Sequence, residues 1–205
     1  MGCAAPHPLH WEDLRSRSEE QILGRDGVRT AADGKSYEVD FLNSVYQVNP
    51  VAERIVELSP NPERELPEEF QILLIRYLVA ENGGPVEGKE VSEKDFTGGV
   101  TFFQGPHALN VAPIVKFYGR DPEAFESRGR ELAAVPVPHG DKAMRFLPFP
   151  LMPVTYVLWK EDEEFPASVS VLFDKSITRW FELDMIFTLV LVLTERIVEG
   201  QTIRE

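Results

Sequence analysis

Hydrophobic positions are densest in the last third of the chain. Residues 154–159 read VTYVLW, with β-branched or aromatic residues on both faces, which predicts a strand covered on both sides. In residues 165–173, FPASVSVLF, valine and phenylalanine alternate with serine and leucine, as in a strand with one buried face. The charged segment KEDEE at 160–164 separates the two strands. We therefore predict an antiparallel hairpin, with Met144–Phe149 as a third strand beside it.

Helical periodicity predicts the remaining elements. A closing helix begins near Asp184, because the apolar residues after it recur at the i, i+3, i+4 spacing: Ile186, Leu189, Val190, Leu193 and Ile197. The same spacing predicts a helix between Trp11 and Leu23 and another that opens at Pro67. Two more are expected at 108–118 and from Asp121-Pro122-Glu123 onward. The apolar run at 185–193 has nine residues, whereas a membrane span needs about 20, so a buried helix is predicted.

The first part of the chain reads as strands. Residues 28–58 contain short alternating segments around an Asp33-Gly34 turn, which favours hairpins. The proline-rich segment 59–67 is the best candidate for a boundary between the N-terminal region and the rest of the chain. Residues 86–104 are expected to be a loop with a short strand or two, and residues 135–141 a connection.

Together these patterns predict a single α+β domain in which an antiparallel sheet is packed by four or five helices. Residues 1–58 form an N-terminal helix and β-hairpin region of that domain, and residues 59–205 its main part.

Composition narrows the classes of function. The chain has 205 residues and a formal net charge of −13, which argues against nucleic acid and against an anionic membrane surface as partners. One cysteine, Cys3, excludes an internal disulfide and a cysteine-rich metal site. The first ten residues lack the pattern of a signal peptide, so a cytoplasmic protein is expected. Cys3 is a candidate catalytic nucleophile. The alternative is a residue without a catalytic role close to a frayed chain end.

Two histidines are the candidate metal ligands. His107 follows a Gly-Pro turn beside two phenylalanines, and His139 precedes a predicted strand. Either imidazole could be the axial ligand of a haem or corrinoid metal, since aromatic walls would sandwich a flat macrocycle. The alternative for each is an ordinary turn or surface histidine.

Aromatic and basic residues between 102 and 159 are the most coherent group of candidate ligand contacts. Arg145 or Lys142 would meet a ligand carboxylate. Asp174, which ends the predicted strand, is a candidate structural or binding residue, and Ser168 and Ser170 could line a polar pocket. The alternative for each aromatic residue is the ordinary core. The aromatic candidates are Phe102, Phe103, Tyr118, Phe146, Tyr156 and Trp159.

Two segments carry a resemblance to a known family. They are the helix–Gly–Pro segment Leu73–Lys89 and the block VLWKEDEEFPASVSVLFD at Val157–Asp174. With them, residues of about 60–198 resemble the family of the domain of unknown function 3786, known mostly from anaerobic prokaryotes. The resemblance implies an anaerobic, redox-cofactor neighbourhood and no catalytic mechanism. Some relatives carry a cysteine-rich iron–sulfur domain, which this chain lacks.

Three functions follow as hypotheses. The first is a non-enzymatic protein of anaerobic redox metabolism that binds a cofactor or an apolar anionic ligand, such as a tetrapyrrole. The second is an accessory module that docks on a redox or methyl-transfer enzyme through an apolar patch bordered by acids. The third is an enzyme whose residues converge only in the fold, such as His107 with Asp174.

Overall fold

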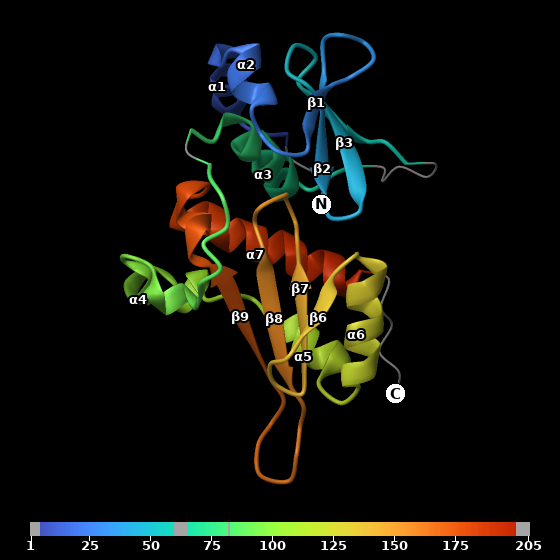
Figure 1. Cartoon of the computed structure of the whole chain (residues 1–205), viewed down its shortest axis with the longest axis vertical. Coiled ribbons are helices and arrows are strands. Elements are labelled where there is room, and N and C mark those ends of the chain that lie inside the picture. The colour runs from blue at the N-terminus through green and yellow to red at the C-terminus, as the bar shows by residue number, and fades with distance from the viewer. Residues whose placement is uncertain (1–4, 60–64, 82, 200–205) are drawn as a thin grey trace.

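The computed structural model describes residues 5–59, 65–81 and 83–199. Two antiparallel sheets lie one above the other along the long axis, and helices pack against both (Figure 1). The α+β class and the antiparallel pairing predicted from the sequence are confirmed. The described residues form seven α-helices, because the predicted N-terminal helix is split in two and one short helix was not expected.

The N-terminal segment is two helices rather than one. α1 spans Pro8–Ser16 and α2 spans Glu19–Leu23. Ser18 separates them: its side chain accepts a hydrogen bond from the Gln21 N–H, and the Gln21 side chain accepts one from the Ser18 N–H. This reciprocal cap starts a new helix. The apolar residues on both sides of the break still have the spacing of one continuous helix, which is why a single helix was predicted.

The first sheet is a four-stranded meander in the order β1-β2-β3-β4. As predicted, a turn at 33–34 joins its first two strands, and Asp33 Oδ1 accepts the N–H groups of Lys35 and Ser36 there. The strands are β1 (Val28–Thr30), β2 (Tyr37–Phe41), β3 (Ser44–Asn49) and β4 (Arg54–Glu57).

Helix α3 (Glu68–Val79) packs against both α1 and the closing helix α7 (Leu183–Val198). Pro67 is its N-cap residue rather than its first helical residue, a shift of one position. Phe70 on α3 lies 4.8 Å from the rings of both Phe41 and Tyr46 in the first sheet. One hydrophobic cluster therefore runs through the whole molecule.

The second sheet has five strands in the order β5-β9-β8-β7-β6. The predicted hairpin of β8 and β9 is confirmed, and β7 is the third strand. Residues 135–141 are not only a connection, because three of them form the edge strand β6; Pro136 within it concealed the strand pattern. The strands are β5 (Glu90–Val91), β6 (Val135–Val137), β7 (Lys142–Phe146), β8 (Val154–Trp159) and β9 (Ser168–Asp174).

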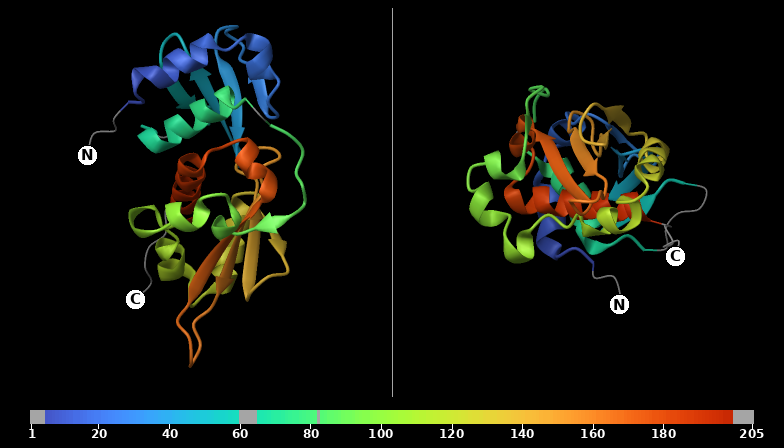
Figure 2. Two further views of the ribbon diagram at one scale, coloured as in Figure 1. Left: turned by 90° about the vertical axis from the view of Figure 1, so that its left-hand side faces the viewer. Right: turned by 90° about the horizontal axis from the view of Figure 1, so that it is seen from below.

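Helices cover only one face of the second sheet (Figure 2). α5 (Ala112–Tyr118), α6 (Pro122–Glu131) and α7 pack there, and Tyr156 of β8 donates to the Val190 carbonyl of α7. Because side chains alternate along a strand, Thr155 and Val157 point to the opposite face, which no helix of the described chain covers. We call this the open face.

The segment between α3 and α5 holds more structure than expected. After β5 come a 3₁₀ turn, Glu93–Asp95, and the short helix α4 (Gly99–Phe102). A Cβ on Gly99 would lie 2.0 Å from the Glu93 carbonyl oxygen, so only glycine lets the two turns approach. No helix in the described part of the chain is both long and apolar enough to cross a membrane.

Candidate functional site

The open face of the second sheet carries a hydrogen-bonded polar cluster centred on Glu90. Glu90 lies on the edge strand β5, and its carboxylate reaches across β9 to residues of β7 and β8. Arg145 Nη2 donates to Glu90 Oε1 at 2.9 Å, and the Thr155 hydroxyl donates to the same oxygen at 3.2 Å. His139 Nε2 lies 3.0 Å from Glu90 Oε2. One carboxylate thus joins three side chains that lie 49 to 65 residues further along the chain.

Strand register explains this convergence. Arg145 of β7 pairs with Thr155 of β8, and Glu90 of β5 pairs with Asp174 of β9, so all four side chains belong to one face. Thr155 is only 2% exposed although no helix covers it, since Glu90 and Arg145 lie over its hydroxyl.

A tight turn brings His139 to the cluster. Gly140, which follows it, has φ of 54°, a left-handed conformation that glycine adopts without strain. A Cβ on Gly140 would lie 2.7 Å from Val157 Cγ1 and 3.4 Å from Trp159 Cε2. The turn is therefore folded down onto the open face, where the Trp159 indole is half exposed.

The electrostatics of the cluster keep Glu90 ionised. Burial alone would raise the pKa of its carboxyl, but hydrogen bonds from Arg145 and His139 outweigh burial, and the pKa lies below its usual range. Arg145 Nη1 and His139 Nδ1 make no hydrogen bond to any residue that the structure describes.

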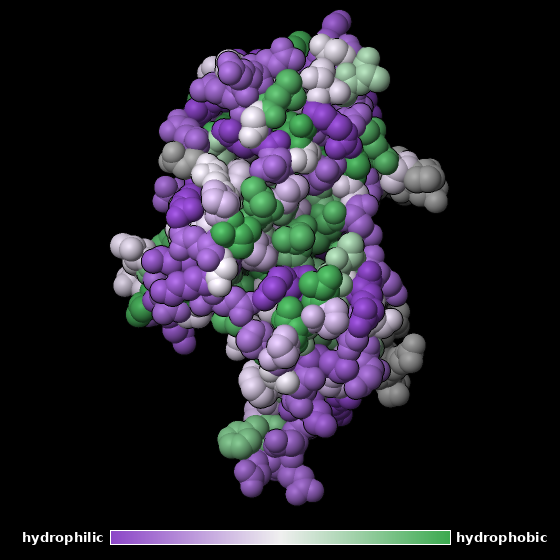
Figure 3. Space-filling view, in the orientation of Figure 1, coloured by the Kyte–Doolittle hydropathy of each residue, from purple (hydrophilic) through white to green (hydrophobic). Residues whose placement is uncertain are grey.

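A hollow of about 220 Å³ lies beside this cluster. Figure 3, in the orientation of Figure 1, shows hydrophobic side chains gathered around a hollow in the middle of the molecule, with hydrophilic ones below it. The hollow combines one cation and two carboxylates with apolar walls. Its lining residues are Val86, Gly88, Glu90, Arg145, Pro153, Thr155 and Asp174.

Asp174 lines the hollow, but both of its carboxylate oxygens accept hydrogen bonds from the backbone. Its carboxylate accepts the N–H groups of Glu87 at 3.0 Å, Gly88 at 2.7 Å and Ser176 at 2.9 Å. Burial would raise the pKa of this group, yet these hydrogen bonds hold the pKa below its usual range. Asp174 holds the loop before β5 against the end of β9.

His107 lies in a separate aromatic cluster. Its ring stacks on Phe102 at 4.8 Å and meets the edge of Phe187 of α7 at 5.8 Å. Ring contacts lead from Phe102 through Phe103 and Phe96 to Phe173, whose side chain points to the helix-covered face. Within the described chain, no hydrogen bond or ring contact links His107 to His139, Arg145 or Asp174.

The other predicted contacts are distributed as follows. Tyr156 is fully buried, and its hydroxyl meets Val190 and Thr194 of α7. Burial raises the pKa of its hydroxyl, and the residue belongs to the core, as do Tyr118 and Phe146. Lys142 is paired with Glu126 at 2.5 Å. Ser168 and Ser170 are exposed on the open face of β9, and Cys3 lies outside the described residues.

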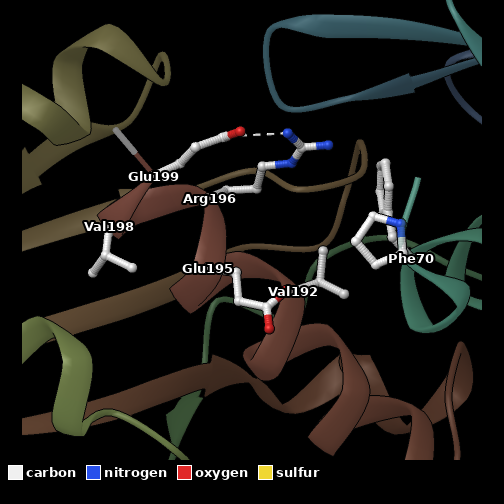
Figure 4. Close-up of a pocket in the computed structure, with 7 residues that line it drawn as sticks. Phe70, Val192, Glu195, Arg196, Val198 and Glu199 are labelled. Carbon is white, nitrogen blue, oxygen red and sulfur yellow. Dashed lines mark hydrogen bonds and ion pairs between the residues drawn. The ribbon is translucent and has the colours of Figure 1, made fainter. Parts of the chain in front are cut away.

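A second cavity, of about 250 Å³, lies between α3 and the end of α7 (Figure 4). Phe70 faces Val192 and Arg196 across it. Arg196 donates to Glu199 at 3.1 Å and to the Tyr46 hydroxyl at 3.2 Å. Burial, and then the nearby charge of Glu69, raises the pKa of Glu195. No residue predicted from the sequence as a ligand contact lies here, so the open-face cluster is the stronger candidate.

Sequence reasoning missed Glu90 and Thr155. The one signal for Thr155 was a hydroxyl within the apolar segment VTYVLW; Glu90, in the charged run EGKEVSEKD, gave none. No group of three or more His, Cys, Asp or Glu side chains in the described residues is arranged to hold a metal ion by itself.

Comparison with known proteins identifies a family. A family model described as "Domain of unknown function (DUF3786)" matches residues 19–196. The match confirms the resemblance found in the sequence and extends it over the first sheet. No curated protein and no solved structure matches the chain.

Proposed function

The chain belongs to the DUF3786 family, and we propose that it is a non-enzymatic binding protein that holds a ligand on the open face through His139 and Arg145. One observation carries the proposal: Glu90 fixes both side chains and leaves one nitrogen of each without a hydrogen bond to a described residue. Side chains fixed in advance lose little conformational freedom when a ligand binds.

The two free nitrogens suit different groups. When His139 Nε2–H donates to the Glu90 carboxylate, the lone pair of Nδ1 is available to a metal centre or a hydrogen-bond donor. A carboxylate partner of this kind commonly orients metal-ligating histidines. Arg145 Nη1 offers a charged donor to a carboxylate or phosphate. The expected ligand therefore carries an acidic group for Arg145 and either a metal centre or a hydrogen-bond donor for His139.

A haem or a corrinoid is the narrower proposal. His139 would be the axial ligand, Arg145 would meet an acidic side chain of the macrocycle, and the Trp159 indole would offer a flat apolar surface. The hollow of about 220 Å³ is smaller than typical pockets for drug-sized ligands, roughly 300–1,000 Å³. A macrocycle would consequently lie across the open face and use the hollow only for its periphery.

The hydrogen bonds and the pKa of Glu90 favour binding over catalysis. Three donors occupy its oxygens, and its lowered pKa leaves it a poor proton donor near neutral pH. The Thr155 hydroxyl donates to Glu90, but the lowered pKa of this carboxyl makes it a weak base for activating a hydroxyl as a nucleophile.

Absorption titrations with haem and with hydroxocobalamin test the narrower proposal. We expect a saturable band that shifts or disappears in His139→Ala, while His107→Ala, the matched histidine control, behaves as wild type. Arg145→Gln is expected to weaken binding roughly 10–100-fold, since a charged hydrogen bond is worth about 1.5–3 kcal/mol. Arg130→Gln, which removes an exposed pair with Glu126, is its control.

Thermal-shift titrations with citrate and with inorganic phosphate test the broader proposal. A saturable stabilisation that needs Arg145 would support an acidic ligand without a macrocycle. If no probe gives a response that depends on His139 or Arg145, and the purified protein carries no bound small molecule by native mass spectrometry, the binding proposal is wrong.

A further inference from the structure

The hairpin of β8 and β9 extends beyond the rest of the molecule at the end opposite the first sheet (Figures 1 and 2). Its connection, residues 160–167, is not part of the open-face cluster. The sequence suggested only a solvated turn here. The described structure shows a fixed loop that presents a large apolar side chain.

The two aromatic side chains most exposed in the described chain both belong to this hairpin. Phe165 is 65% exposed at the tip, and Trp159 is 50% exposed at the end of β8. Figure 3 shows a hydrophobic side chain among hydrophilic ones at this lower end. Aromatic residues supply much of the binding energy of protein interfaces when a partner desolvates them.

Hydrogen bonds fix the loop that carries Phe165. Asp162 Oδ1 accepts the N–H groups of Glu164 at 2.8 Å and Phe165 at 2.7 Å, and Asp162 N–H donates to the Phe165 carbonyl. At its base, Glu161 N–H donates to the Gly119 carbonyl and Arg120 pairs with the Glu161 carboxylate at 2.9 Å. The tip is therefore ordered before any partner arrives, which lowers the entropic cost of docking.

The charges around Phe165 define the partner. Residues 161–164 are all acidic, and only Glu161 is paired with a cation in the described structure. A surface that accepts this tip needs an apolar pocket for the phenylalanine and lysine or arginine at the rim. A second copy of the chain fits poorly, because each copy carries a net charge of −13 and like-charged tips repel.

We propose that the tip of this hairpin docks into an apolar, basic-rimmed pocket of a different protein, with Phe165 as the anchor. The complex depends on salt because exposed charges of opposite sign steer it. This inference is independent of ligand binding at His139 and Arg145, so either can fail without the other.

Site-specific photocrosslinking of the full-length chain tests it. p-Benzoylphenylalanine is placed at position 165, and at position 51 as control, where Val51 is 79% exposed far from the hairpin. Proteins captured in an extract of the source organism at 165 but not at 51 are identified, produced and titrated with the purified chain. We expect Phe165→Ser to weaken binding by roughly tenfold or more, and Glu163→Gln with Glu164→Gln to weaken it and reduce its salt dependence.

The crosslinked peptide of the partner provides the second readout. It should contain apolar residues flanked by lysine or arginine. Capture that is equal at 165 and 51, capture of this chain itself, or a purified partner that binds Phe165→Ser as tightly as wild type would each overturn the proposal. Val51→Ser is the control variant and should leave the affinity unchanged.

Discussion

Asp174 is 4% exposed and owes its place to hydrogen bonding rather than to ligand chemistry. Three backbone N–H groups satisfy its carboxylate, and such charge-assisted bonds offset the cost of burying the charge. The same bonds tie residues 87–88 to the end of β9, which sets where Glu90 enters the open face. A structural acid thus positions the carboxylate on which the candidate site depends.

Asp174→Asn is expected to lower the free energy of unfolding by about 1–3 kcal/mol near neutral pH, because the amide nitrogen cannot accept the Gly88 N–H. The pKa of Asp174 is lowered in the folded protein, so the stabilisation is complete above the unfolded pKa of about 4 and is lost as pH falls below it. The difference in free energy of unfolding between wild type and variant should therefore be smaller at acidic pH.

Urea denaturation at neutral and acidic pH measures this difference. Asp162→Asn is the matched control, since Asp162 also accepts two backbone N–H groups but is exposed, and its replacement should cost less. An Asp174→Asn variant as stable as wild type at neutral pH would contradict the structural role.

At the scale of elements, capping residues decide where helices begin. Asp121 caps α6 by accepting the Ala124 N–H, as the Asp-Pro-Glu pattern predicted. Ser18 performs the same function for α2, yet the periodicity on either side of it predicted one continuous helix. Reciprocal capping at Ser18 and Gln21 therefore outweighs helical spacing over this short segment.

Ser18→Ala removes the acceptor for the Gln21 N–H and is expected to cost about 0.5–2 kcal/mol. The loss should appear as faster amide hydrogen exchange in residues 19–23 and a lower urea midpoint. Ser16→Ala is the control, because the Ser16 hydroxyl donates only to the Asp13 carbonyl within α1 and its loss should stay within about 0.5 kcal/mol. Equal effects of the two variants would count against the cap.

At the scale of the molecule, Phe70 connects the two sheets. Its ring contacts Phe41 and Tyr46 of the first sheet, and Arg196 of α7 lies 5.0 Å above it. Because α7 also packs under the second sheet, unfolding of one sheet exposes apolar surface of the other. The proposed boundary at 59–67 stays a prediction, and residues 60–64 of it lie outside the described chain.

Phe70→Ala is expected to destabilise the whole protein by about 3–5 kcal/mol through the cavity it leaves. Variants that retain only Trp11, in α1, or only Trp159, in β8 of the second sheet, should report the same urea midpoint as each other, both with and without the Phe70→Ala change. Separate midpoints would show that the two parts unfold independently.

The sequence by itself determined most of the secondary structure of this protein. The run of β-branched and aromatic residues in β8, the alternation in β9, the 3.6-residue period of α3 and α7, and the Asp33-Gly34 and Asp121-Pro122 signals act over a few residues, so they can be read locally. The edge strand β6 and the short helix α4 were not predicted, because Pro136 and the glycines at 98–99 are atypical of a strand and a helix. Both elements are stabilised by contacts with distant segments.

Tertiary structure alone decided the candidate site. Nothing local shows that Glu90 will cross β9 to reach Arg145 and His139, because strand order and register depend on pairing between distant segments. The same pairing places His139 on the open face and His107 among the aromatic rings near α7, although the two were equivalent candidates in the sequence. Residue types are fixed by the sequence, whereas their convergence depends on which face of the sheet the helices leave open.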